Sequence, residues 1–327
     1  MEQILKVQNL EVVFESYEGD RTVLDIEEFS LQRGESVGLV GESESGKSVL
    51  AFSILDILPM PPGRIERGEI IWEGENLLGK DFRRMKNIQG QEIAMIFQDP
   101  KSTLNPVITV GKQITNVLQK NHGWNRKKAY EKALQYLEQV KLSDPHSIMA
   151  KYPHELSGGQ RQRIIIAIAL SCGAKLLIAD EPTRNLDVTI QAGVLKLLAE
   201  LKKELQITTL FLTNNMGLVP VMCDRAGILH KGRIVEQGPA KTVVQNPRHP
   251  YTRMLLELMP GRKEISEETL QQINVAEKDT VISGDACLYY PYCSRALEEC
   301  RKQRPKLDGE KEEHLVACFN PIEGEKA

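Results

Sequence analysis

The segment GESESGKS at residues 41–48 constrains this chain more than any other feature of its sequence. It satisfies the pattern G-x-x-x-x-G-K-[ST], in which backbone N–H groups of a glycine-containing loop and of the following helix surround phosphate groups. VGLV at 37–40 predicts a buried strand before the loop, and the apolar spacing of VLAFSILDIL after it predicts a helix. The required strand–loop–helix context makes a chance glycine turn the weaker interpretation. The predicted phosphate site comprises Gly41, Glu42, Ser43, Glu44, Ser45, Gly46, Lys47 and Ser48.

A second group of residues predicts the metal-binding half of this site. In such a loop Lys47 reaches the outer phosphates and Ser48 ligates Mg²⁺. Farther along, LLIAD at 176–180 predicts a strand that ends in Asp180, where a carboxylate can hold Mg²⁺ through water. Glu181 follows at a position suited to orienting an attacking water. Strands often end in solvated acids, so these two carboxylates indicate phosphoryl chemistry only together with the loop.

The remaining periodicity predicts a mixed α/β fold. Residues 4–13 and 23–40 alternate apolar and polar positions with glycine-containing breaks, as short antiparallel strands do. Residues 126–141 place apolar side chains three and four apart, which predicts an amphipathic helix. A parallel sheet with crossover helices is expected from the strand 176–180, the helix 187–205, the strand 208–213 and the strand–turn–strand 226–238.

Charge and hydropathy exclude several classes of protein. The chain has 327 residues with 42 Lys and Arg against 45 Asp and Glu, a net charge of −3 that gives no bias toward nucleic acid. The longest apolar run, residues 164–170, is far shorter than the roughly 18 residues that cross a bilayer. The first residues lack a basic segment followed by an apolar one. We therefore expect neither a membrane span nor a secretion signal.

LSGGQRQR at 156–163 completes a set of four ordered motifs. With GESESGKS, Gln98 in IFQDP and LLIADEPT, it resembles the signature of ABC-transporter ATPases over most of residues 1–245. The resemblance implies a P-loop ABC ATPase core: a RecA-like parallel sheet, an antiparallel β subdomain and a helical subdomain near residues 100–170. It also implies that two such subunits sandwich two molecules of ATP head to tail.

The resemblance assigns roles to individual residues. Ser157 can cap the helix that begins at 158–160, and Gly158, Gly159 and Gln160 would meet the γ-phosphate of a nucleotide held by the second subunit. Gln98 resembles the glutamine that touches Mg²⁺ and water and links the site to the membrane subunits. Asp187 resembles a residue of the subunit interface, and a helix N-cap is the compatible alternative. Adenine would stack on Tyr17 or on Phe14, for which strand packing is the alternative.

Two positions depart from the family pattern. Glu44 stands where these ATPases usually carry glycine, and Asn214 stands where they carry histidine. A carboxylate about 4 Å from a phosphate charge costs about 4 kcal/mol at an effective dielectric constant of about 20, so Glu44 must point away, be protonated or weaken binding. Asn214 cannot become cationic. We expect impaired hydrolysis at this chain's own site. The LSGGQ signature is intact and should still complete the partner's site, and this asymmetry favours a heterodimer.

HPYT at 249–252, followed by LLELMP, narrows the resemblance to the ATPase subunits of peptide and nickel importers. It implies two domains: an ATPase domain over 1–245 and a C-terminal extension over 246–327. The implied function is ATP-driven peptide uptake across the membrane. The chain itself would lie at the cytoplasmic face of that membrane. The implied partners are a second ATPase subunit, two transmembrane permease subunits and, indirectly, an extracellular solute-binding protein. The alternative is a catalytically weak regulatory partner of an active ATPase, favoured by Glu44 and Asn214 and opposed by Glu181.

Four of the six cysteines fall in the extension, at Cys287, Cys293, Cys300 and Cys318. Their spacing matches neither a zinc ribbon nor a ferredoxin, so by itself it is weak evidence for a metal. The importer resemblance implies a [4Fe–4S] cluster on these four residues, with zinc or free thiols as the alternatives. The other two, Cys172 and Cys223, lie in apolar segments and are predicted to belong to the core.

Overall fold

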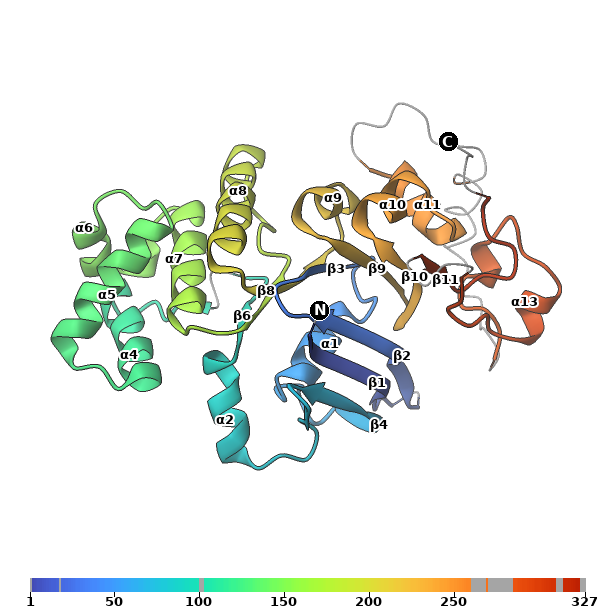
Figure 1. The fold of residues 1–327 in the computed structure, drawn as a ribbon, viewed down its shortest axis with the longest axis horizontal. Helices are drawn as coiled ribbons and strands as arrows, with labels where there is room; N and C mark the ends of the chain where they lie inside the picture. The colour runs from blue at the N-terminus through green and yellow to red at the C-terminus, as the bar shows by residue number, and fades with distance from the viewer. Residues whose placement is uncertain are drawn as a thin grey trace. The chain divides into compact units, whose positions relative to one another are not determined.

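The computed structural model describes residues 2–17, 19–99, 103–259, 269, 285–309 and 314–323. The chain forms two compact units, each discontinuous in sequence (Figure 1). The first holds residues 1–2, 32–34 and 76–211, and the second holds residues 3–31, 35–75 and 212–327. The domain boundary predicted at residue 245 lies inside the second unit and stays a prediction. Residues 260–268 and 270–284 of the predicted extension lie outside the described residues.

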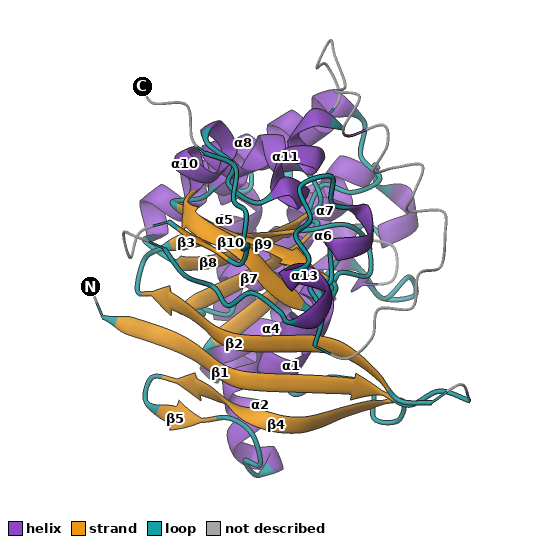
Figure 2. Ribbon diagram, turned by 90° about the vertical axis from the view of Figure 1, so that its right-hand side faces the viewer, coloured by secondary structure: helices purple, strands orange, loops and turns teal. Residues whose placement is uncertain are grey.

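An antiparallel sheet in the second unit has the strand order β2-β1-β4-β5. Within it, β1 and β4 pair antiparallel with Leu5 opposite Trp72, and Figure 2 shows the three long strands side by side. Alternate residues such as Leu24 and Ile26 are buried, as the period of two along a strand requires. The strands are β1 (Gln3–Phe14), β2 (Arg21–Gln32), β4 (Gly63–Trp72) and β5 (Glu75–Asn76).

A parallel strand pair in the second unit positions the phosphate loop. β3 (Ser36–Val40) pairs in parallel with β9 (Arg225–His230), and every residue of β3 is buried. A strand covered on both faces carries a continuous rather than an alternating apolar sequence, as here. β10 (Arg233–Pro239) pairs antiparallel with β9 and with β11 (Leu315–Val316). The helices of this unit are α1 (Lys47–Ile54), η2 (Met216–Leu218), α9 (Val219–Met222), α10 (Ala240–Gln245), α11 (Pro250–Glu257), η3 (Tyr290–Tyr292) and α13 (Glu299–Lys302).

The first unit combines a second parallel strand pair with a group of helices. β6 (Ile93–Ile96) pairs in parallel with β7 (Leu176–Asp180), and Ile96 lies opposite Ala179. Four helices pack on one another (Figure 1), namely α4 (Val110–His122), α5 (Arg126–Gln139), α6 (Pro145–Ala150) and α7 (Gly158–Ser171). The unit also contains α2 (Phe82–Gln91), η1 (Pro153–Glu155), α8 (Val188–Leu205) and most of β8 (Thr208–Thr213).

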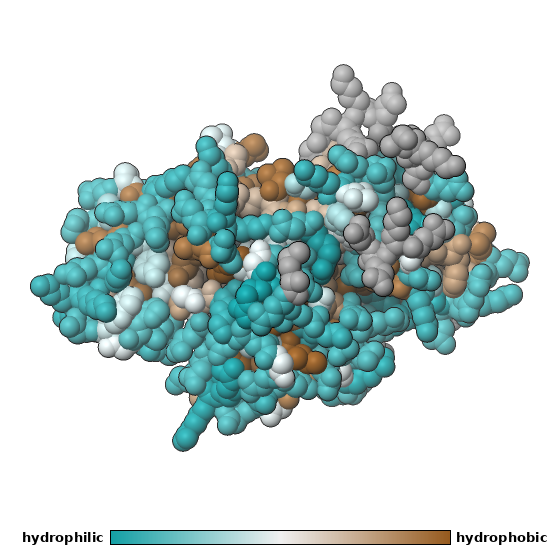
Figure 3. Space-filling model, viewed as in Figure 1, coloured by the Kyte–Doolittle hydropathy of each residue, from teal (hydrophilic) through white to brown (hydrophobic). Residues whose placement is uncertain are grey.

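The predicted α/β fold with a helical subdomain is confirmed. The helical subdomain expected near residues 100–170 is the group α4 to α7, and the amphipathic helix expected at 126–141 is α5, with Ala129, Ala133 and Leu137 buried. The face drawn in Figure 3 is mostly hydrophilic, with hydrophobic residues in small groups. Among the described helices, none combines the length and the apolar character needed to cross a bilayer.

Candidate functional site

The loop between β3 and α1 forms the phosphate-binding half of the candidate site and lies in the second unit. Gly46, which precedes α1, has a φ of 107°, a left-handed conformation that residues with side chains rarely adopt. A Cβ atom at Gly41 would lie 2.2 Å from the carbonyl oxygen of Leu229 in β9, so the loop packs too closely for any side chain there. The Gly41 N–H donates to the Thr213 carbonyl at 3.3 Å. Backbone contacts therefore hold both ends of the loop.

Lys47 folds back over this loop. Its side chain is buried, and Nζ donates to the carbonyl oxygens of Gly41 at 2.8 Å and Glu42 at 2.7 Å and to Ser45 Oγ at 3.3 Å. Each of these acceptors belongs to the loop, so the ammonium group lies within the loop that binds phosphate in a site of this pattern. The donor set fits a triphosphate, because a bound phosphate would offer Lys47 stronger acceptors than neutral carbonyls do.

The two unusual residues near this loop are both exposed. Glu44 has a φ of 65°, so it adopts the left-handed conformation that favours glycine. Its side chain is exposed, and which of the three alternatives for this carboxylate applies stays a prediction. Asn214 follows the last residue of β8 and is also exposed. The effect of either residue on hydrolysis stays a prediction.

The carboxylate half of the candidate site lies in the first unit. Asp180 is the last residue of β7 and is buried, and Glu181 follows it with 8% of its surface exposed and a φ of 42°. Gln98, two residues after β6, donates from Nε2 to Glu181 Oε2 at 3.0 Å. Because β6 and β7 are parallel neighbours, their carboxyl ends meet at one edge and bring Gln98 and Glu181 together. The structure thus joins two residues that the sequence predicted for one site.

Arg184 is a member of this half that the sequence analysis missed. Its Nη1 atom donates to Glu181 Oε2 at 3.0 Å, so the guanidinium and the Gln98 amide share one carboxylate oxygen. Arg184 lies three positions after Glu181 in the turn before α8, where no helical spacing in the sequence marks it as a partner of that carboxylate. Glu181 is therefore held by two donors on Oε2.

Ser157 caps α7 in the first unit, as predicted. Its hydroxyl accepts from the Gln160 N–H at 3.3 Å, and Gln160 Oε1 accepts from the Ser157 N–H at 3.0 Å, so the two residues form a capping box. Gly159 has a packing reason as well, because a Cβ there would lie 2.6 Å from Ile190 Cγ2 of α8. Gly158 is less crowded. The signature therefore presents a capped helix N-terminus that is favourable for an anion.

Asp187 and Tyr17 differ in how far the structure explains them. Asp187 Oδ1 accepts from the Ile190 N–H at 3.0 Å and caps α8, so the N-cap alternative is confirmed. Tyr17 is fully exposed in the turn after β1, and Phe14 at the end of β1 is half-buried. The exposed ring of Tyr17 is accessible to a base, but neither residue is brought into contact with the phosphate loop by any interaction among the described residues.

Comparisons with known proteins decide the family. The oligopeptide transport ATP-binding protein OppD of Bacillus subtilis is 40% identical over 317 residues, which are 97% of this chain and 88% of that protein. The protein of the same name from Salmonella typhimurium is 39% identical over 98% of this chain and 94% of its own length. The ABC transporter family model matches residues 24–184. The chain belongs to the ABC transporter family of ATP-binding proteins.

Solved structures agree with this ABC fold. CbiO1 of Clostridium perfringens, part of the ABC transporter complex cbiONQ, has a TM-score of 0.63 and 28% identity, covering 74% of this chain and 91% of that one. The ATP-binding cassette MJ0796, solved with ADP and Pi, has a TM-score of 0.64 over 72% of this chain and 99% of its own, and its 24% identity shows the fold alone. As an ABC ATPase, the chain couples ATP hydrolysis to transport.

A second family model, the C-terminal region of oligopeptide/dipeptide transporters, matches residues 235–300 of this ABC ATPase. Cys287, Cys293 and Cys300 lie in this region and Cys318 lies beyond it, and none of the four forms a disulfide. Burial, with a smaller contribution from the nearby thiols of Cys318, Cys287 and Cys300, raises the pKa of Cys293 to about 12. Burial likewise raises the pKa of Cys318 to about 11. The four thiols thus lie near one another in a poorly solvated environment.

Backbone donors accompany these sulfur atoms. The Leu297 N–H donates to Cys300 Sγ at 3.4 Å, and backbone hydrogen bonds from Tyr289 and Tyr290 reach Cys287. However, no three His, Cys, Asp or Glu side chains converge as metal ligands anywhere in the described ranges. The predicted iron–sulfur cluster is therefore not shown by the structure and stays a prediction. Cys172 and Cys223 are buried in the apolar core, as predicted.

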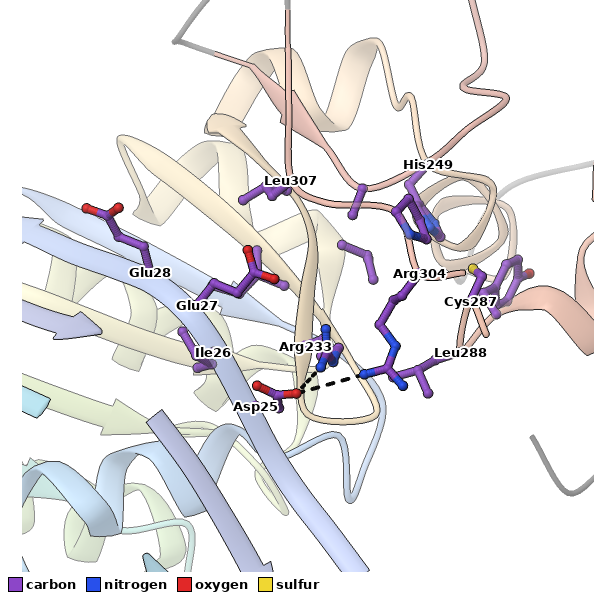
Figure 4. Close-up of a pocket in the computed structure, with 15 residues that line it drawn as sticks. Asp25, Ile26, Glu27, Glu28, Arg233, His249, Cys287, Leu288, Arg304 and Leu307 are labelled. Carbon is purple, nitrogen blue, oxygen red and sulfur yellow. Dashed lines mark hydrogen bonds and ion pairs between the residues drawn. The ribbon is translucent and has the colours of Figure 1, made fainter. Parts of the chain in front are cut away.

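A separate small cavity lies in the second unit beside these cysteines. It has a volume of about 50 Å³, enough for water but not for a nucleotide, and is lined by β2, β10 and the segments around Cys287 and Arg304. Figure 4 shows Asp25 beside Arg233 and Arg304. The Asp25 carboxylate hydrogen-bonds Arg233 and lies 3.9 Å from Arg304 Nη1. Burial, aided by the Arg304 charge, lowers the pKa of Arg233 to about 10. This charge cluster ties the C-terminal residues to the antiparallel sheet.

Proposed function

We propose that this ABC ATPase drives the uptake of oligopeptides or dipeptides by an importer. The observation that carries the proposal is about 40% identity over nearly the whole chain to proteins named for oligopeptide transport, together with the transporter C-terminal region at residues 235–300. In this function the chain binds at the cytoplasmic face of the membrane to two permease subunits, which an extracellular solute-binding protein supplies.

The residues divide the chemistry between them. Lys47 and the loop amides would bind the phosphates of ATP, and Ser48, Asp180 and Gln98 would hold Mg²⁺. Mg²⁺ supplies positive charge that offsets the negative charge of the phosphates. Glu181 would orient the attacking water and accept its proton, which requires its carboxylate to exchange the Arg184 and Gln98 contacts for that water. Tyr17 would stack on adenine.

We further propose that this chain works in a heterodimer with a second ATPase. Glu44 places a carboxylate in the phosphate loop, and Asn214 cannot carry the positive charge of the usual histidine, so the chain's own site is impaired. The intact, capped signature at Ser157 and Gln160 would complete the partner's site. A regulatory subunit with little hydrolysis of its own is the second candidate, and the same two residues favour it.

Lys47→Ala tests nucleotide binding at the phosphate loop. It removes the buried ammonium group that the loop carbonyls now hold, and we expect retention of labelled Mg-ATP to be abolished. Lys202→Ala, on the last turn of α8, is the matched control because it removes an equal charge outside both halves of the site. Failure of the wild-type chain to bind Mg-ATP at millimolar concentration, with its partner present, would mean that the site is vestigial. Turnover of the isolated chain against that of the heterodimer separates the two candidate functions.

For the cysteines we propose a structural iron–sulfur cluster. Its support is four free thiols in one environment and backbone N–H donors at the sulfur atoms, a feature that tunes such clusters in proteins. The thiols would have to converge and lose their protons, and metal binding drives both changes. The residues that would hold the cluster are Cys287, Cys293, Cys300 and Cys318.

Anaerobic purification tests the cluster. The protein is expected to be brown, to absorb broadly at about 400 nm and to contain roughly four irons per chain. Cys293→Ser should bleach it while leaving ATP binding intact, whereas Cys172→Ser, a change at a buried core cysteine, should keep the colour. Colourless protein with one zinc per chain, or with no metal, would refute the cluster.

A further inference from the structure

The segment His249-Pro250-Tyr251 at the start of α11 has no assigned part in ATP binding or hydrolysis. His249 and Tyr251 are both buried, and Tyr251 has no exposed surface at all. A tyrosine in the core normally brings its hydroxyl group to a hydrogen-bond partner. The hydrogen-bond partner of the Tyr251 hydroxyl group therefore indicates the role of this segment.

The Tyr251 hydroxyl reaches the phosphate loop, 209 residues away in sequence. It donates to Glu42 Oε2 at 3.2 Å, and the Glu42 N–H donates to the same hydroxyl oxygen at 3.3 Å. Glu42 is the second residue of the loop, and its carbonyl oxygen accepts from Lys47 Nζ at 2.7 Å. One side chain of the C-terminal region thus holds both the backbone and the carboxylate of a loop residue that Lys47 also contacts.

We propose that Tyr251 is a positioning residue for nucleotide binding, through which the C-terminal region holds the phosphate loop in its binding conformation. Loops that are ordered before their ligand arrives bind more tightly, because less conformational freedom is lost on binding. Tyr251 also keeps the Glu42 carboxylate directed toward the C-terminal region. Burial, and then the Glu42 charge, raise the pKa of Tyr251, so the phenol remains a donor.

Hydrogen bonds fix the backbone of Tyr251, as a positioning role requires. His249 caps α11 by accepting from the Tyr251 N–H at 3.0 Å. The His249 N–H in turn donates at 2.9 Å to Glu236 of β10, a carboxylate with no exposed surface that His314 Nε2 also approaches at 2.7 Å. These hydrogen bonds fix the backbone of Tyr251 to β10. Tyr251 can therefore restrain the phosphate loop rather than move with it.

The ring of Tyr251 packs against aromatic side chains, one of which lies close in sequence to the cysteines. Its centroid lies 4.3 Å from that of His230 and 5.5 Å from that of Tyr289. Tyr289 is buried and follows Cys287 by two residues, and Figure 4 shows Cys287 and His249 lining one cavity from separate segments. A second contact holds the loop through β9–β10, where the Gly232 N–H donates to the Ser45 carbonyl at 2.8 Å. Tyr251 therefore links the packing of the C-terminal region to the conformation of the phosphate loop.

Tyr251→Phe tests this inference, because it keeps the ring and its packing and removes only the hydroxyl group. In the purified full chain we expect labelled Mg-ATP to bind about three- to tenfold more weakly, and in the assembled transporter we expect the KM for ATP to rise while kcat at saturation stays within about twofold. Tyr289→Phe is the matched control, since it removes a hydroxyl that contacts Met254 rather than the loop. A loss of packing would lower the thermal midpoint of both variants, whereas only Tyr251→Phe should weaken binding.

A double-mutant cycle with Glu42 sharpens the test. In the Glu42→Ala background the hydroxyl has no carboxylate to hold, so Tyr251→Phe should weaken binding less than it does in the wild type. Full binding by Tyr251→Phe, or equal losses in Tyr251→Phe and Tyr289→Phe, would overturn the inference. Neither result would bear on nucleotide binding itself, which Lys47→Ala tests separately.

Discussion

Glu44 has a left-handed backbone conformation, with a φ of 65°, in the loop that the family uses to bind phosphate. A residue with a side chain pays about 1 kcal/mol for this conformation, whereas glycine does not. The exposed side chain also adds a negative charge beside the phosphate site. Glu44 therefore acts in two ways that can be separated by experiment: on the backbone of the free chain and on the affinity for ATP.

Glu44→Gly should raise the stability of the nucleotide-free chain by about 0.5–1 kcal/mol and tighten Mg-ATP binding. Urea unfolding measures the first effect and equilibrium binding the second. Gln206→Gly is the matched control, since Gln206 at the end of α8 has a φ of 49° but lies outside the phosphate loop. Gln206→Gly should stabilise without changing affinity. If neither variant changes affinity, the Glu44 carboxylate does not act on the nucleotide.

Helix caps connect sequence to function at the scale of the element. The Ser157 capping box closes the N-terminus of α7 with two reciprocal hydrogen bonds, and the same serine belongs to the signature. Asn125 caps α5 in a similar way, accepting from the Lys128 N–H at 2.9 Å, but has no place in any motif. The two caps are a natural pair for separating stability from function.

Ser157→Ala and Asn125→Ala should each cost about 1 kcal/mol of stability, because each leaves a helix N–H group without its side-chain acceptor. Only Ser157→Ala should also lower ATP turnover in the assembled complex. Urea unfolding and steady-state hydrolysis measure the two effects. If both variants lose turnover in proportion to stability, Ser157 has a structural role only.

Local patterns explain which elements could be predicted from the sequence. The buried strand β3, the phosphate loop and α8 follow from periodicity and turn chemistry within short segments. The contact of Gln98 with Glu181 follows once β6 and β7 are known to be parallel neighbours. The bond from Tyr251 to Glu42 could not be predicted, because nothing local records a contact across 209 residues.

At the scale of the whole molecule, the proposed asymmetry divides the chain's residues between two sites. In this proposal Glu44, Asn214 and Glu181 act at the chain's own nucleotide, whereas Ser157 acts at the partner's nucleotide. Arg184 and Gln98 also hold the Glu181 carboxylate, so it must exchange these contacts for the water that it would orient. The chain should therefore contribute more to turnover through its signature than through its own carboxylate.

Steady-state ATP hydrolysis by the reconstituted transporter, measured for Ser157→Arg and Glu181→Gln side by side, tests this account most directly. Ser157→Arg places a long cation at the N-terminus of α7, where it opposes the helix dipole and blocks the partner's site, and should remove most of the turnover. Glu181→Gln should have the smaller effect, because the proposal holds that Asn214 impairs this chain's own site. Asn214→His combined with Glu44→Gly should raise turnover. Equal losses from Ser157→Arg and Glu181→Gln would contradict the asymmetry.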